Sequence, residues 1–115
     1  MKQERKERLT KAGVNLPKGR KRFMDNEGLY EDFLNKFPQD RNMYLLEEAL
    51  QAEKAEEAFH AAHTLLGLAA NLSLEALAQA LRPVTEALRG GDIAAAKSSM
   101  PKVKEIYIAM IAAFN

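Results

Sequence analysis

The segment "AFHAAHTLLGLAANL", residues 58–72, decides the fold of this 115-residue chain. It contains His60 and His63, the only two histidines of the sequence, within a run of alanine and leucine. Drawn as a helix with about 100° per residue, the segment gathers its apolar side chains on one stripe and places His63 on the opposite side. The sequence therefore predicts a helix over about 53–72 with a buried stripe and a solvent-facing His63. The expected stripe comprises Ala58, Ala61, Leu65, Leu68, Ala69 and Leu72.

The rest of the chain also carries helical signals, and no strand-like alternation is long enough to compete with them. The clearest break is "RGGD", residues 89–92, where Gly90 and Gly91 suit the left-handed position after a helix and Asp92 can cap the next. Helices joined by such short turns run antiparallel. The predicted fold is all-α, an antiparallel up-down four-helix bundle with a short extra N-terminal helix or helices. Further helices are expected at about 17–24, 29–37, 40–51, 73–89 and 93–113.

Local signals also predict where these helices begin and which side they bury. Asn15 can cap the helix that Pro17 opens, and Asp40 can cap the helix that follows Pro38. Ser73 can cap the helix that it opens, which runs to Arg89. The apolar side of the helix at 29–37 is expected to comprise Leu29, Phe33, Leu34 and Phe37. That of the helix at 40–51 is expected to comprise Met43, Leu46 and Leu50.

Charge divides the chain into a basic start and an acidic body. Residues 1–22 hold nine Lys or Arg against two Glu, and residues 23–115 hold eight basic against fourteen acidic residues. We interpret residues 1–12 as a solvated, poorly docked basic leader and residues 13–115 as a single helical bundle domain. A basic arm can bind nucleic acid or an acidic partner, but no aromatic residue for base stacking accompanies this one. We therefore do not expect nucleic-acid binding.

Composition excludes several classes of protein and of site. Cysteine is absent, which removes disulfides, thiolate zinc sites and cysteine nucleophiles, and makes the cytoplasm the expected compartment. No apolar run approaches the roughly 20 residues that span a bilayer, so no membrane association is expected. His60 and His63 could supply two ligands, but no third histidine or cysteine completes a metal site. Hydrolytic chemistry would need a pocket, whereas only Glu56 and Glu57 lie beside His63 on a convex surface.

The remaining possibility is an exposed histidine that carries a phosphoryl group. This chemistry needs a histidine that a partner protein can reach, and it does not need an enclosed pocket. A free imidazole titrates near neutral pH, so much of it offers a nitrogen lone pair at pH 7. Gly67, one turn after His63, removes a side chain that would crowd an incoming phosphoryl group. Exposed apolar residues beside the histidine can dock a partner protein. The expected docking surface comprises Glu56, Phe59, His60, Leu66, Gly67 and Ala70.

Residues 62–77, "AHTLLGLAANLSLEAL", resemble the signature A-H-x-L-K-G-x-A-x-x-L-G of histidine-containing phosphotransfer (HPt) domains. The resemblance extends over most of the chain, from "AGVNLPKGRKRF" to "LRGGDIAAAKSSMPKVKEIY". It implies a four-helix bundle in which His63 is the phosphorylated residue of a multistep two-component phosphorelay. It also implies partners, namely response-regulator receiver domains and a hybrid histidine kinase, with Mg²⁺ held by the receiver. The chain itself would be a phosphoryl carrier without kinase or phosphatase activity. The matching residues are Ala62, His63, Leu65, Gly67, Ala69 and Leu72.

Two positions depart from this signature. Leu66 stands where the family has a lysine, and Ser73 stands where it has a second glycine. The lysine would place a positive charge near a phosphohistidine, which carries about −2. The alternative function is therefore an HPt-like binding or scaffold module that docks a receiver without efficient transfer. Basic residues that could compensate are Lys36, Arg41 and Arg82.

Overall fold

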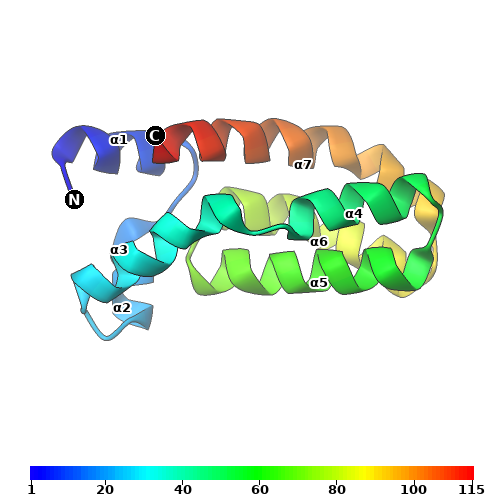
Figure 1. Cartoon of the computed structure of the whole chain (residues 1–115), viewed down its shortest axis with the longest axis horizontal. Coiled ribbons are helices and arrows are strands. Elements are labelled where there is room, and N and C mark those ends of the chain that lie inside the picture. Colours follow the sequence, from blue (N-terminus) through cyan, green and yellow to red (C-terminus); the bar gives the residue numbers. More distant parts are fainter.

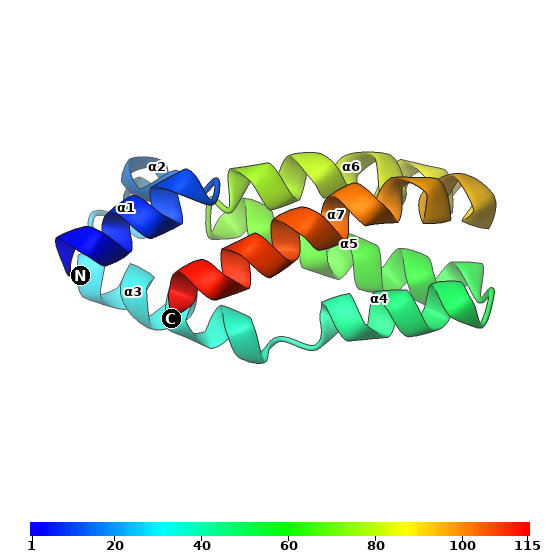
Figure 2. The same ribbon diagram turned by 90° about the horizontal axis from the view of Figure 1, so that it is seen from above.

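The computed structural model describes residues 1–115, and most of them are helical. Consecutive long helices lie side by side and run antiparallel (Figure 1). The three N-terminal helices lie together at one end of this bundle (Figure 2). The predicted fold class is confirmed. The four bundle helices, called the long helices below, are α4 (Asn42–Gln51), α5 (Ala55–Asn71), α6 (Glu75–Arg89) and α7 (Ile93–Phe114). The N-terminal ones are α1 (Gln3–Lys11), α2 (Leu16–Arg22) and α3 (Glu27–Lys36), the last as long as α4, with a 3-10 turn η1 (Phe37–Gln39) before α4.

One hydrophobic core fills the space between the four long helices. The expected stripe of α5 is buried with the exception of Leu68, which is half-buried, and Ala62 joins it. Met43, Leu46 and Leu50 of α4 are buried as predicted. Both Pro83 and Pro101 lie inside helices, which continue through them. The buried α5 residues are Ala58, Ala61, Ala62, Leu65, Ala69 and Leu72, none more than 3% exposed.

The three turns that join the long helices share one backbone geometry. Each has a single residue with positive φ: Glu53 at 57°, Ser73 at 58° and Gly91 at 75°. In each turn the next residue donates its N–H to a carbonyl five residues earlier, at 2.8 to 2.9 Å. This is the Schellman ending of an α-helix, which favours glycine at the left-handed position. Asp92 then caps α7 by accepting the Ala95 N–H at 3.0 Å, as predicted.

The basic leader is a docked helix, so its interpretation as solvated and poorly docked is wrong. Leu9 of α1 is fully buried in the core. Arg5 pairs with Glu31 of α3 at 3.4 Å, and α1 packs along α7. The Arg8 guanidinium donates to the backbone carbonyl of Asn115 at 3.0 Å. Contacts with residues distant in the sequence therefore order a helix, α1, that has only one large apolar side chain of its own.

The buried side of α3 differs from the predicted one. Leu34 and Phe37 are buried as expected, but Leu29 and Phe33 are more than 40% exposed. Tyr30 takes the buried position instead, because its hydroxyl donates a hydrogen bond to the Leu72 carbonyl at 2.7 Å. Burial raises the pKa of Tyr30 to about 12. The Tyr30 ring also packs against Gly19, where a Cβ atom would collide with the phenol.

The loop between α1 and α2 is hydrogen-bonded to the turn between α5 and α6. The Asn15 N–H donates to the Ser73 carbonyl at 2.9 Å, and the Ala76 N–H donates to the Gly13 carbonyl at 3.1 Å. Asn15 also caps α2, as predicted, by accepting the Lys18 N–H. These bonds fix the C-terminal end of α5 to a segment nearly 60 residues earlier in the chain.

Candidate functional site

His63 lies in the middle of α5 and is exposed, on the side opposite the buried stripe. The helix holds it rigidly, since α5 packs against both α4 and α6. The predicted orientation of this histidine is therefore correct. A nucleophile in this position is open to a second protein and is not enclosed by its own chain.

Gly67 leaves open space one helical turn after His63. An added Cβ atom at this position would meet no atom within 4 Å, and the backbone is ordinary α-helix. Neither packing nor conformation therefore requires glycine here. Because glycine inside a helix costs about 0.5–1 kcal/mol relative to alanine, its presence needs another explanation. Free access to the His63 ring is one that the geometry supplies.

The expected docking surface around His63 is only partly exposed. Glu56, His60 and Gly67 are exposed, whereas Phe59, Leu66 and Ala70 are half-buried. Phe59 and Leu66 pack against the hydrophobic core, so they are not a free apolar patch. The Phe59 ring stacks on the His63 imidazole, with ring centroids 5.6 Å apart and planes inclined by 29°.

Two shallow hollows flank this part of α5. One lies between α4 and α5 and includes Leu45 and Ala49, and the other lies beside the α6–α7 turn and includes Phe59 and Arg89. Both hollows include Glu56 and His60. His60 therefore stands on the ridge between them, one turn from His63, which agrees with a place at the rim of a docking surface.

Comparison with known proteins identifies the family. The family model described as Hpt domain matches residues 28–113, which is most of the chain and includes α3 to α7. The chain belongs to the Hpt domain family. Domains of this family are phosphocarrier modules that act with receiver domains and histidine kinases in phosphorelays. No curated protein and no solved structure matches the chain.

In this Hpt domain one basic side chain contacts the aromatic ring that stacks on His63, and it is not one of those predicted. Lys36 lies over the Phe33 ring and Arg41 lies over the Tyr44 ring. Arg82 is exposed on α6 and makes no salt bridge.

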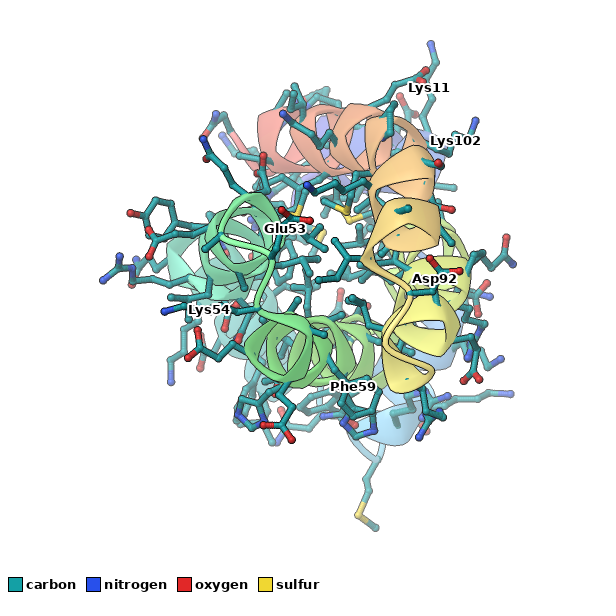
Figure 3. The ribbon with its side chains drawn as sticks, turned by 90° about the vertical axis from the view of Figure 1, so that its right-hand side faces the viewer. Lys11, Glu53, Lys54, Phe59, Asp92 and Lys102 are labelled. Atoms are coloured by element: carbon teal, nitrogen blue, oxygen red, sulfur yellow. The ribbon has the colours of Figure 1, made fainter.

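Arg89 is the basic residue that sequence reasoning missed. Its guanidinium carbon lies 5.1 Å from the centre of the Phe59 ring, the same ring that stacks on His63. Figure 3 shows Phe59 where α5 and α6 lie side by side. Arg89 follows His63 by 26 residues, so no local spacing in the sequence signals the contact.

Ser73 does not cap α6, contrary to the sequence-based prediction. Its hydroxyl is buried and has no hydrogen-bond partner, and α6 has no side-chain cap at its N-terminus. The Gly13 carbonyl accepts the Ala76 N–H in the first turn of α6 instead. Ser73 thus occupies a left-handed position without any polar contact of its side chain that would favour serine.

Nowhere do three or more His, Cys, Asp or Glu side chains gather as they would around a metal ion. None of the helices has the length and apolar character needed to cross a membrane. Burial raises the pKa of Tyr30 and of Tyr107.

Proposed function

We propose that His63 accepts a phosphoryl group from the aspartyl phosphate of a receiver domain and passes it to the aspartate of another. The donor would be the receiver of a hybrid histidine kinase and the final acceptor the receiver of a response regulator. The chain would then be a phosphoryl carrier, with no kinase or phosphatase activity of its own. Family membership supports the general class of this function, and the site supports the choice of His63.

The transfer step follows from the chemistry of the imidazole. A ring nitrogen of neutral His63 attacks the phosphorus of the acyl phosphate, so a P–N bond forms as the P–O bond to aspartate breaks. The aspartate leaves as a free carboxylate. The ring keeps its proton on the other nitrogen, which makes the product a phosphoimidazolium. Transfer to the next aspartate is the same step in reverse.

The partner would supply the rest of the machinery. Acyl-phosphate transfer needs charge neutralisation around the phosphoryl group, and Mg²⁺ held by the receiver is the expected source. In keeping with this, no three His, Cys, Asp or Glu side chains of this chain gather as they would around a metal ion. What this chain contributes is a rigid, exposed nucleophile and free space beside it.

The observation that carries the proposal is the pairing of an exposed His63 with an unobstructed Gly67 on one face of α5. His60 provides a matched control, because it is also exposed and lies one turn away on the same helix. The test is incubation of the purified protein with a phosphorylated receiver or hybrid kinase from the same organism, followed by detection of acid-labile phosphate. We expect His63→Gln to lose all labelling and His60→Gln to keep most of it. Equal labelling of His63→Gln would remove His63 from the mechanism.

The absence of the usual lysine supports a second candidate function. Leu66 is half-buried against the core and carries no charge. A module of this kind could bind a receiver and sequester it without transferring phosphate efficiently. This function predicts receiver binding without phosphohistidine in the natural protein, together with labelling that appears in Leu66→Lys. Efficient labelling of the natural protein would dismiss it.

A further inference from the structure

We propose that Arg89 of α6 is the cation that binds the phosphoryl group on His63, in place of the lysine that Leu66 replaces. The inference rests on the proposed function, since it concerns His63 in its phosphorylated form. It assigns a positioning role to a residue on a different helix from the signature motif.

The first step in the argument is the path of contacts from Arg89 to His63. The Arg89 guanidinium lies over the Phe59 ring at 5.1 Å from its centre, and that ring stacks on the His63 imidazole at 5.6 Å. Phe59 and His63 are one turn apart on α5, so a single aromatic side chain separates the cation from the nucleophile. The stack holds the guanidinium on the exposed side of the α5–α6 pair.

The second step is the pairing of Arg89 before phosphorylation. Its Nε atom lies 3.3 Å from a carboxylate oxygen of Glu86, and both side chains are more than half exposed. Exposed ion pairs of this kind are weak, so the guanidinium can exchange partners. A phosphoryl group brings about two negative charges and three acceptor oxygens, whereas Glu86 brings one charge. The planar guanidinium can bind two phosphoryl oxygens at once. We therefore expect phosphorylated His63 to draw Arg89 away from Glu86.

The third step compares Arg89 with the three cations that the sequence suggested. Arg41 and Lys36 lie over the rings of Tyr44 and Phe33, and neither ring is paired with His63. Arg82 precedes Arg89 by seven residues and so lies on the same side of α6, but no aromatic contact joins it to Phe59. Among the cations that lie over aromatic rings, Arg89 is the one whose ring stacks on His63.

The experiment measures the half-life of the phosphohistidine in the full chain. Phosphoramidate labels accessible histidines directly, so it separates this inference from transfer by a receiver. Removing one charge-assisted hydrogen bond at an exposed site should shorten the half-life of Arg89→Gln about fivefold. Arg89→Lys should be intermediate, because it keeps the charge but loses the planar fork. Glu86→Gln should lengthen the half-life, because it removes the competing carboxylate.

Two controls make the result specific. Arg41→Gln removes an arginine that lies over a ring at the same 5.1 Å, and we expect no change. The ³¹P signal of the phosphohistidine, followed against pH, reports the phosphoryl group itself, and it should titrate at higher pH in Arg89→Gln than in the natural protein. A purely structural role for Arg89 would not move that titration.

Each remaining outcome decides the question. Equal half-lives for Arg89→Gln and the natural protein would overturn the inference, as would a shortened half-life in Arg82→Gln alone. Labelling by phosphoramidate without labelling by any receiver would overturn the proposed function. The role of Arg89 would then still be decided by the half-life of the phosphohistidine in Arg89→Gln. Failure of phosphoramidate to label His63 would overturn both.

Discussion

Gly67 and Ser73 stand at the two glycine positions of the Hpt signature, and the structure gives them opposite requirements. Gly67 lies in regular helix with open space around it, so the fold would accept any helix-forming residue there. Ser73 has a φ of 58° and is buried, so the fold would favour glycine there. The chain thus has a glycine where the fold needs none and lacks one where the fold would benefit. The difference indicates that Gly67 serves something outside the fold, such as access of a partner to His63.

The largest expected effect comes from substituting a glycine that packing does require. Gly19 of α2 lies against Tyr30, and a Cβ atom at residue 19 would collide with the phenol ring. We expect Gly19→Ala to lower the free energy of unfolding by about 3 kcal/mol, because overpacking displaces Tyr30. Urea unfolding followed by circular dichroism measures this loss. An unchanged midpoint would mean that the two helices separate without cost.

Loss of the hydrogen bond between the Tyr30 hydroxyl and the Leu72 carbonyl should have the next largest effect on stability. Tyr30→Phe removes the hydroxyl that donates to the Leu72 carbonyl, so a buried acceptor loses its partner. The expected loss of stability is about 1.5 kcal/mol. Urea unfolding of Tyr30→Phe at neutral pH checks it, and a loss as large as that of Gly19→Ala would show that this bond carries all of the Gly19 effect.

Alkaline unfolding tests the same residue through its pKa. Burial raises the pKa of Tyr30 to about 12, above the ordinary value near 10, so the folded state holds the phenolic proton more tightly than the unfolded state does. The stability that this provides is present below pH 10 and is lost as the pH rises from 10 to 12. Tyr30→Phe should show a shallower loss across that window. Some slope should remain, because burial raises the pKa of Tyr107 as well.

Ser73→Gly tests the other half of the comparison. Glycine removes both the left-handed strain and the unpartnered buried hydroxyl, so stability should rise by about 1 kcal/mol. Glu53→Gly is a matched control, because Glu53 has nearly the same φ in the preceding turn but is exposed. We expect Glu53→Gly to gain less. A loss of stability in Ser73→Gly would show that the serine makes a contribution that its geometry does not reveal.

Gly67→Ala has the smallest expected effect on stability. It should stabilise the fold, whereas Gly19→Ala should destabilise it. Alanine at residue 67 should raise the free energy of unfolding by about 0.7 kcal/mol, because it favours the helix and meets no neighbour. Phosphorylation of His63 should become slower in the same variant. Stability and labelling rate, measured on one preparation, should therefore move in opposite directions. If both fall, Gly67 is a structural residue after all.

Much of this fold follows from local sequence signals. The caps at Asn15 and Asp92 and the buried stripe of α5 depend on residues close together in the chain, and the structure confirms them. The docking of α1 could not be predicted in this way, because Leu9 is its only large apolar residue and its ion pairs reach to Glu27 and Glu31.

The candidate site shows the same limit. The exposure of His63 follows from the helical periodicity of α5 alone, and the structure agrees with it. The contact of Arg89 with Phe59 depends on the position of α6 along the axis of α5. The α5–α6 turn and its hydrogen bonds to the N-terminal segment determine that position. Sequence reasoning accordingly named three other cations and missed this one. The apolar docking patch was overestimated for a similar reason, since Phe59 and Leu66 are half-buried against the hydrophobic core.

The packing of α1 along α7 has a consequence for the order of the helices in the chain. Because Arg8 bonds to Asn115, the C-terminus lies beside α1, and the N-terminus lies at the other end of this short helix (Figure 1). A short linker could therefore join residue 115 to residue 1, and the chain could be reopened at the exposed Gly90–Gly91 turn. Such a circular permutant would begin with α7 and end with α6, while the face of α5 that carries His63 would stay the same. Its folding would show that the site depends on which helices pack together and not on the order in which they are connected.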